Sequence, residues 1–597
     1  MRKGVNGTTS VLVPREIDIN PYTTFRIMSS IVEQFVKTSE EHSTRYALRS
    51  KTKTVTWGEY RANVERVAAS LQQVGLKPGE SVSILGFNSF EWFYSAMGAL
   101  YAGGVFTGIY TTNGPSAIQY VLEKSESKVL VVEKVSSELL EMFEMLENPL
   151  VVVVLGENIK VNNPLVTSYA WETFIELGEE PLEPFYGDAD SLCSLIFTSG
   201  TTGNPKGVEL IQKNIMSAIT MAMGIYEMDN ERIVSYLPLS HVAAQVLDIF
   251  CHFYHKGTVY FAQPDALKGT LVHTLSECRP TLFFGVPRVW EKIEEKMRSV
   301  ASEKYKGVVG GILYLVSLLG KSATSMWHSE QSSGILQLPV YCTYLFYSNF
   351  VFSSIKAQLG LDQCKYFLTG AAPIKNSTLE YFGSIDILIM ELYGMSETSG
   401  LISLQTPDNY EFGSCGIPVC EVKIASDGEI LVKGDNVFRG YYRDEAATQE
   451  TLIDGWLHTG DLGTLENDRL FITGRKKELI ITAGGENVAP VLIEDHLRRL
   501  LPEIESCVVV GDKQKFLSLL VTLKPEVDAS SKHIQQGIGT YNEQFSISNA
   551  QKIQKFCVLP NAFSVETNEL TPTLKLKRKV IMSKYQDEIG RMYGVMK

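Results

Sequence analysis

The stretch LIFTSGTTGNPKG, residues 195–207, joins a short apolar run to a loop of hydroxyls and glycines that ends near a lysine. Glycines let a backbone turn bring several N–H groups onto phosphate oxygens. The Lys206 ammonium adds a positive charge. Further hydroxyl donors come from Thr198, Ser199, Thr201 and Thr202. The stretch therefore predicts a phosphate-binding loop after a buried strand, with a plain surface turn as the simpler alternative.

The common nucleotide-binding loop, G-x-x-x-x-G-K-[ST], does not match this stretch. In that loop a glycine precedes the lysine, and the Ser or Thr that follows it binds magnesium. Here Pro205 precedes Lys206 and Gly207 follows it. A P-loop phosphotransferase is therefore opposed at two diagnostic positions.

Length and composition limit the kinds of protein to which this loop can belong. A chain of 597 residues is too long for one hydrophobic core, so at least two domains are expected. With 44% apolar and 21% charged residues, wholesale disorder is excluded. The net charge of -13 argues against a nucleic-acid partner. The nine cysteines include no C-x-x-C pair, which opposes a disulfide framework or zinc ribbon and favours a reducing compartment.

Helical and strand patterns alternate through the first part of the chain. Residues 69–89, 91–112 and 121–133 each read as a helix, a turn and then a strand. The runs at 151–156 and 191–200 are continuously apolar before they end in glycine, as buried strands are. Strands that alternate with helices predict a parallel sheet covered on both faces, and hence an α/β fold.

The pattern of apolar and polar residues changes from about Gly413. A turn-rich stretch with the hairpin signal Asp427-Gly428 predicts a small β unit. A helix is expected to start near Pro490, and strands are expected at 506–511 and 516–523. The polar break at 474–477 divides the chain into an N-terminal domain (1–473), a hinge (474–477) and a C-terminal α+β domain (478–597).

Two apolar segments, 308–320 and 335–352, bear on membrane contact. The first is shorter than the ~20 residues that span a bilayer, and the second carries Gln337, Pro339 and Asn349. A buried helix pair is the simpler interpretation, and a surface that dips into a bilayer is the alternative. No secretory signal or S-K-L terminus is present. We therefore expect a cytoplasmic protein, with peripheral association with an intracellular membrane left open.

The pattern T-S-G-T-T-G-x-P-K-G resembles the signature of the ANL superfamily of adenylate-forming enzymes, which includes acyl-CoA synthetases, adenylation domains and luciferases. Further blocks resemble the same superfamily in the same order: LPLSHVAAQ (237–245), LTGAAPI (368–374), YGMSET (393–398), GWLHTGDLG (455–463), GRKKELIITAGGENVAP (474–490) and LTPTLKLKR (570–578). The first and last blocks, with the long 290–365 segment, look most like the bubblegum-type long-chain acyl-CoA synthetases. The fold implied is a large N-terminal adenylate-forming domain of parallel α/β sheets plus a small β unit, and a small mobile C-terminal domain.

The resemblance implies a two-step reaction. A fatty acid and ATP would give an acyl-adenylate and pyrophosphate, and CoA would then give acyl-CoA and AMP, with Mg²⁺ as cofactor. Two anions must meet in the first step, so the protein must neutralise charge and orient the attack on the α-phosphate. ATP and AMP contacts are implied for Thr198, Ser199, Gly200, Thr201, Thr202, Gly203, Lys206, Gly370, Ala371, Ala372, Tyr393, Gly394, Met395, Ser396, Asp461 and Arg475.

Individual roles follow from the same resemblance. Glu397 would hold Mg²⁺, with Thr198 near the metal. Adenine would lie between residues 370–372 and Tyr393, and Asp461 would bind the ribose with Arg475 nearby.

The C-terminal motif implies a lysine that offsets the repulsion between the α-phosphate and the carboxylate. Lys575 matches that lysine, but Leu574 stands where the family usually has glycine, so Lys577 stays open as the operative residue. Lys477 matches a hinge residue about which the small domain turns between the two steps.

Three further positions complete the expected site. The turn would bring Gly485 and Glu486 toward CoA. His241 would line the acyl pocket.

Other functions are compatible with some of these motifs. An aryl-CoA ligase or a luciferase-like enzyme would keep the adenylation and change the acid or the acceptor. A catalytically inert lipid-binding relative is opposed by the presence of Lys206, Glu397, Asp461, Arg475 and Lys575. A metal site at Cys251, His252 and His255 is rejected, because the spacing lacks a second ligand pair.

Overall fold

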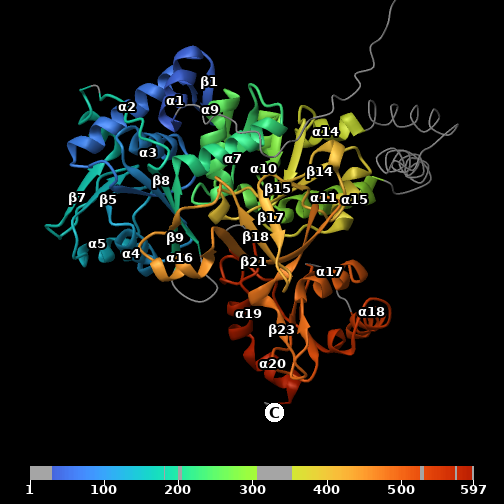
Figure 1. The fold of residues 1–597 in the computed structure, drawn as a ribbon. Helices are drawn as coiled ribbons and strands as arrows, with labels where there is room; N and C mark the ends of the chain where they lie inside the picture. Colours follow the sequence, from blue (N-terminus) through green and yellow to red (C-terminus); the bar gives the residue numbers. More distant parts are fainter. Residues whose placement is uncertain are drawn as a thin grey trace, which may run out of the picture.

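The computed structural model describes residues 30–180, 182–198, 205–304, 352–524, 530–571 and 574–594 of the chain. Residues 199–203 of the phosphate loop lie outside the described residues, as do the apolar segment 308–320 and residues 335–351 of the second one. Figure 1 shows a larger N-terminal body, coloured from blue to orange, and a smaller C-terminal lobe beneath it, which runs from orange to red. In the part of the chain that is described, no helix is both long and apolar enough to cross a bilayer.

The first sheet has eight strands in the order β19-β9-β8-β4-β3-β5-β6-β7. Its parallel strands are β3 (Ser81–Leu85), β4 (Val105–Ile109), β5 (Ser127–Val132), β6 (Leu150–Val154), β7 (Val166–Ala170) and β8 (Leu192–Thr198). The predicted parallel sheet is confirmed. An antiparallel edge, β9 (Lys206–Ile211) and β19 (Gly440–Tyr441), extends it in a way that the alternation of helices and strands did not indicate.

Helices cover this sheet because their first turns are capped and their inner faces are apolar. α2 (Trp57–Gln73) begins at Thr56, whose hydroxyl accepts from the Glu59 N–H while the Glu59 carboxylate accepts from Thr56 N–H. The neighbouring helices are α1 (Ile31–Glu41), α3 (Phe90–Tyr101), α4 (Pro115–Lys124), α5 (Ser137–Glu144), α6 (Trp171–Glu176) and α7 (Gln212–Ile225). The helix–turn–strand predictions for 69–89, 91–112 and 121–133 are thereby confirmed.

A second sheet lies beside the first and carries the stretches LTGAAPI (368–374) and YGMSET (393–398) at the ends of two of its strands. Its strands are β12 (Leu282–Phe284), β13 (Tyr366–Thr369), β14 (Ile389–Tyr393), β15 (Ser403–Leu404) and β16 (Ile417–Pro418), the first three parallel. A third sheet holds β10 (Arg232–Ser235), β11 (Thr258–Phe261), β1 (Tyr46–Arg49) and β2 (Thr54–Thr56). Helices around them are α8 (Val242–Ala244), α9 (Cys251–His255), α10 (Leu271–Cys278), α11 (Pro287–Lys304), α14 (Ser353–Leu359) and α15 (Asn376–Gly383).

The small β unit is confirmed after Gly413. It contains β17 (Glu421–Ile424), β18 (Glu429–Lys433), β20 (Leu452–Ile453), β21 (Trp456–Glu466) and β22 (Arg469–Arg475), with α16 (Glu445–Thr451) beside it. The 474–477 segment is not wholly a loop. Gly474 and Arg475 finish β22, because β21 offers them backbone partners, and a 3-10 turn over Lys476–Glu478 follows.

The C-terminal lobe has its own hydrophobic cores. Its elements are β23 (Ile480–Ile481), β24 (Asn487–Val488), α17 (Pro490–Leu500), β25 (Ile504–Val510), β26 (Leu517–Leu523), α18 (Ser531–Gln544), β27 (Ile553–Val558), α19 (Arg578–Lys584) and α20 (Gln586–Tyr593). The helix starts at Pro490 as predicted. The buried apolar clusters before Ile472 share no member with those from Ile480 onward, so the two lobes pack separately.

Candidate functional site

One continuous cleft of about 2940 Å³ runs along the sheets of the N-terminal domain and under the C-terminal lobe. Its lining includes these predicted residues: Thr198, Lys206, His241, Gly370, Ala371, Ala372, Tyr393, Gly394, Met395, Ser396, Glu397, Asp461, Arg475, Lys477, Lys575 and Lys577. Gly485 and Glu486 do not line it. They lie on the turn between β23 and β24, where the Glu486 carboxylate accepts a hydrogen bond from the Ser548 hydroxyl at 3.0 Å.

The two ends of the phosphate loop are fixed by a β-hairpin. Thr198 ends β8 and Lys206 begins β9, and the two are directly paired. Lys206 Nζ lies 4.8 Å from the centroid of the Tyr441 ring, a cation–π contact. The antiparallel edge strand β19 delivers Tyr441 to this point. The hairpin therefore places the lysine and the loop entrance side by side at one edge of the cleft.

Glu397 is a buried carboxylate that accepts a hydrogen bond from a tyrosine. It is 7% exposed, and Tyr441 Oη donates to its Oε1 at 2.8 Å. Burial raises the pKa of the Glu397 carboxyl, and the Tyr441 hydrogen bond opposes that rise. Among the residues that the structure describes, none forms an ion pair with Glu397. A desolvated carboxylate oxygen is a ligand that suits a hard cation such as Mg²⁺.

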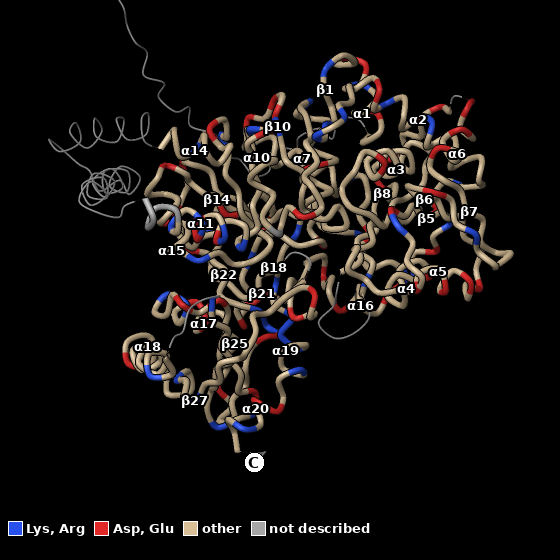
Figure 2. The backbone as a smooth tube through the Cα atoms, turned by 180° about the vertical axis from the view of Figure 1, so that it is seen from behind, with Lys and Arg blue, Asp and Glu red and all other residues tan. Residues whose placement is uncertain are grey.

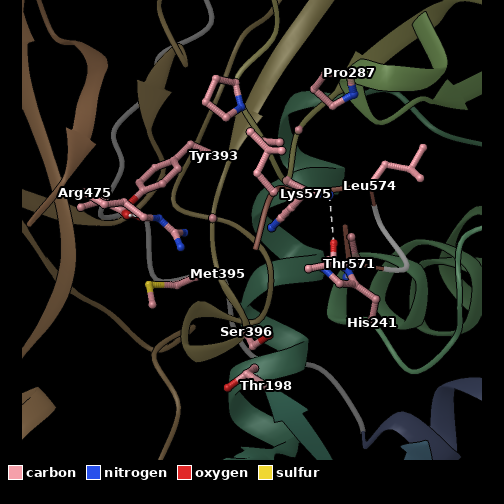
Figure 3. Close-up of a pocket in the computed structure, with 18 of the residues that line it drawn as sticks. Thr198, His241, Pro287, Tyr393, Met395, Ser396, Arg475, Thr571, Leu574 and Lys575 are labelled. Carbon is pink, nitrogen blue, oxygen red and sulfur yellow. Dashed lines mark hydrogen bonds and ion pairs between the residues drawn. The ribbon is translucent and has the colours of Figure 1, made fainter. Parts of the chain in front are cut away.

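Asp461 ties two strands of the site together. Tyr393 Oη donates to its Oδ2 at 2.8 Å, and Arg475 Nε lies 2.9 Å from its Oδ1. The register of β21 with β22 sets Asp461 directly opposite Arg475. Burial, reinforced by the Asp461 charge, raises the pKa of the Tyr393 phenol, which therefore remains a neutral donor. The Tyr393 ring is thereby held against the cleft (Figure 3).

The segment 370–372 follows the carboxyl end of β13, beside the end of β14. A Cβ on Gly370 would meet the Leu392 carbonyl oxygen at 2.8 Å, so only glycine allows the two strands this approach. Ala371 has φ +70°, in the left-handed region. Carboxyl ends of adjacent parallel strands are where open α/β sheets bind ligands. The geometry suits a flat ring between this backbone and Tyr393.

Lys575 reaches this cleft on a tight turn. Its N–H donates to Thr571 Oγ1 at 2.9 Å, and the Thr571 N–H donates to the Lys575 carbonyl at 2.8 Å. Burial, and then the Arg475 charge, lowers the pKa of the Lys575 ammonium to about 8. Lys577 Nζ instead donates to Asn568 Oδ1 at 2.5 Å, within its own lobe. Of the two lysines, Lys575 is the one whose charge is coupled to Arg475 and Asp461.

Leu574 is strained where the family pattern has glycine. Its φ is +62°, a left-handed conformation that costs a non-glycine residue roughly 1 kcal/mol. Although leucine replaces glycine at this position, the turn keeps the left-handed backbone conformation that glycine adopts easily. In Figure 3 Leu574 and His241 lie on one side of Lys575, and Arg475 and Tyr393 on the other.

His241 is a neutral residue at the junction of polar and apolar walls. Its Nδ1 accepts from the Ala243 N–H at 3.2 Å and caps α8, so the ring proton is on Nε2. Burial, and then the Lys575 charge, lowers the pKa of His241 to about 3. The apolar lining beyond it comes from Ala218, Ala222, Val242, Val246 and Leu247.

Two residues of the cleft were missed by sequence reasoning. Tyr441 belongs to a two-residue strand that no periodicity reveals. Glu391 lies on β14, lines the cleft, and has an Oε1 with no hydrogen-bond partner among the described residues; burial raises its pKa to about 8. In the sequence, Glu391 could have been recognised as the single acidic residue within the apolar run before Tyr393.

The stretch with Cys251, His252 and His255 closes the end of α9. His255 Nδ1 accepts from the Gly257 N–H at 3.1 Å, and His252 Nε2 lies 3.1 Å from the Gly257 carbonyl oxygen. The helix ends before Gly257, at Lys256, which is left-handed. In the described ranges, no group of three or more His, Cys, Asp or Glu is placed to hold a metal ion.

Comparison with known proteins identifies the family. The AMP-binding enzyme family matches residues 35–442, and the AMP-binding enzyme C-terminal domain matches residues 477–597. The long-chain-fatty-acid–CoA ligase ACSBG2 of Gallus gallus is 39% identical over 629 residues, which cover 95% of this chain and 81% of the relative.

Solved structures share the fold. The anthranilate CoA ligase AuaEII in complex with anthranoyl-AMP has a TM-score of 0.72 at 19% identity, with 93% of this chain and 97% of that one covered. The Bacillus subtilis O-succinylbenzoate CoA synthetase MenE, in complex with ATP and magnesium ion, has a TM-score of 0.66 at 23% identity, with 92% and 98% covered. The family matches and the extended similarity to ACSBG2 lead to one conclusion: this chain belongs to the AMP-binding enzymes of the ANL superfamily, related to the bubblegum-type long-chain-fatty-acid–CoA ligases.

Proposed function

We propose that this chain is a long-chain-fatty-acid–CoA ligase that uses ATP to form an acyl-adenylate and then acyl-CoA, with release of pyrophosphate and AMP. The observation that carries the proposal is the convergence of Lys575, the Asp461–Arg475 pair and Glu397 on one cleft that continues into an apolar branch. The names of its relatives support the same substrate class.

In the first step, the phosphate-binding edge would be supplied by Thr198, Lys206 and the loop between them. Glu397, oriented by Tyr441, is the residue that would hold Mg²⁺, which when bound neutralises phosphate charge. Tyr441 thus positions both charges, since its ring faces Lys206 and its hydroxyl holds Glu397.

The nucleoside would lie along the second sheet. Adenine would pack between residues 370–372 and the Tyr393 ring, next to Gly394, Met395 and Ser396. Asp461 would exchange its contacts with Tyr393 or Arg475 for ribose hydroxyls. Lys575 would lie near the α-phosphate, where its ammonium offsets the repulsion between two anions.

The second step would require Lys575 to leave. We propose that the boundary between domains is the 474–477 segment and that the C-terminal domain turns at Lys477, whose side chain is exposed. The position of Gly485 and Glu486 outside the cleft supports this: they reach CoA only if the lobe turns.

The acyl chain would occupy the apolar branch past His241. Each buried CH₂ contributes about 0.8 kcal/mol, so a deep branch favours a long chain over an aryl acid. Because such acids partition into bilayers, we also propose peripheral membrane association, which flotation with liposomes of varied composition tests. A protein that stays at the bottom of every gradient contradicts it.

The test is release of AMP and pyrophosphate across fatty acids of graded length, with and without CoA. The proposal expects AMP release that depends on CoA and on a long-chain acid. No pyrophosphate with any acid would refute it, and activity only with aryl acids would reassign the substrate. Lys575→Ala should abolish pyrophosphate release yet leave thioester formation from supplied acyl-adenylate largely intact.

A further inference from the structure

Two ion pairs cross from the N-terminal domain to the C-terminal lobe, and Arg288 and Glu505 of one pair line the cleft that holds Lys575. Arg288, in the first turn of α11, bonds the Glu505 carboxylate of β25. Glu295 of α11 lies 3.4 Å from Lys524 Nζ, just after β26. Figure 2 shows the C-terminal lobe with α17 below the part of the N-terminal domain that holds α11 and α15.

The two pairs have opposite polarity. In one, the cation belongs to the N-terminal domain; in the other, the cation belongs to the C-terminal lobe. A shift that aligned Arg288 with Lys524, or Glu295 with Glu505, would bring like charges together. Opposite charges therefore meet in one orientation of the C-terminal lobe, and like charges would meet in shifted orientations. Charge patterns of this kind confer specificity.

The network is partly buried. The Arg288 side chain is 22% exposed and Glu505 is 15% exposed. Arg288 Nη1 also lies 3.1 Å from Glu291 Oε2, and Lys375 Nζ lies 3.4 Å from Glu291 Oε1. Burial alone would raise the pKa of Glu291, but Lys375, Arg288 and Arg498 of α17 together lower it. Screening by solvent is weaker for the Arg288–Glu505 pair than for a surface pair, so this contact contributes more; the Glu295–Lys524 pair is more exposed, at 38% and 30%, and contributes less.

Packing connects the network to the lysine. Leu576, next to Lys575, is partly buried and packs against the buried cluster that contains Val508 and Val510 of β25. On the other side, Arg288 directly follows Pro287, which lines the cleft near Lys575 (Figure 3). A strand and a helix end thus connect the ion pairs to both walls of the site.

We propose that Arg288 and Glu505 are positioning residues for the first half-reaction. Their ion pair, with the oppositely oriented Glu295–Lys524 pair, holds the C-terminal lobe in the orientation that places Lys575 in the cleft. The network thereby favours formation of the acyl-adenylate over formation of the thioester. This inference rests on the proposed function, which supplies the two half-reactions.

A double-mutant cycle tests it. Arg288→Gln, Glu505→Gln and the double variant are compared with wild type in pyrophosphate release without CoA, and in thioester formation from supplied acyl-adenylate. Each single change should slow the first step about fivefold, the double variant should be no slower than either, and the second step should be unchanged or faster. The matched control is Glu503→Gln, since Glu503 pairs with His533 of its own lobe at 2.8 Å.

Equal slowing of both steps, or effects that multiply in the double variant, would overturn the inference. Failure of the proposed function looks different: wild type would then release no pyrophosphate with any acid. In that case the orientation of the C-terminal lobe is followed by the rate of trypsin cleavage at the exposed Lys477. Glu505→Gln should be cut faster than wild type and Glu503→Gln, and equal rates would overturn the positioning role.

Discussion

Raising the pH above 8 is expected to suppress pyrophosphate release through Lys575. Burial and Arg475 lower the pKa of this lysine from 10.5 to about 8. The protonated form is the one proposed to act, so activity is present below pH 8 and is lost as the pH rises. The protonated fraction falls from about nine-tenths at pH 7 to about one-tenth at pH 9, which predicts a roughly tenfold fall in kcat/KM. A lysine with its ordinary pKa would lose only a few per cent.

The assay is pyrophosphate release without CoA at subsaturating ATP, since kcat/KM reports the free enzyme. Lys575→Arg keeps its charge over the whole range, so its rate should show no such fall, whatever fraction of activity remains. Lys577→Arg is the matched control and should behave as wild type, because Lys577 is bonded to Asn568. A wild-type profile that is flat to about pH 9.5, or the same fall in Lys575→Arg, would refute the reasoning.

Three further predictions concern Tyr441, Leu574 and His255. Tyr441→Phe removes the hydrogen bond to Glu397, so the Mg²⁺ concentration for half-maximal pyrophosphate release should rise about tenfold; an unchanged Mg²⁺ titration contradicts this. Leu574→Val puts a β-branched residue at φ +62° and should slow pyrophosphate release about fivefold, whereas Leu574→Gly should not slow it. Equal rates for the two variants would exclude backbone strain as the cause. The pKa of buried His255 is lowered to about 4, so its contribution to stability is lost as the pH falls from about 6.5 to 4, roughly 2 kcal/mol by pH 5. His255→Asn should therefore lose less Tm than wild type between pH 7 and 5, and parallel losses would count against the assignment.

Local sequence patterns predicted much of the fold because local physics decides it. The apolar runs of β3 to β6 are buried on both faces, and the glycine and proline at Gly428 and Pro490 mark a hairpin and a helix start. Such features depend on neighbours within a few residues. Most of the motif residues that the structure describes also line one cleft, whereas Gly485 and Glu486 do not.

What the sequence could not predict depends on long-range pairing. Tyr441 reaches Glu397 only because a two-residue strand joins β9 from more than 200 residues away. The choice between Lys575 and Lys577 depends on the turn at Thr571 rather than on the spacing of the lysines. The Arg288–Glu505 pair requires the placement of one lobe on the other, about which residue spacing carries no information.

The strand β22 ends at Arg475, two residues before the proposed hinge Lys477. In the proposed turn at Lys477, a group next to the pivot would hardly move, whereas Lys575, a hundred residues further along the chain, would travel with the whole lobe. Arg475 and its partner Asp461 would therefore keep their contacts with the nucleotide in either orientation, while Lys575 would enter and leave the cleft. The chain would thus exchange its chemistry around a stationary ligand, and the adenylate would not have to be released and captured again between the two steps.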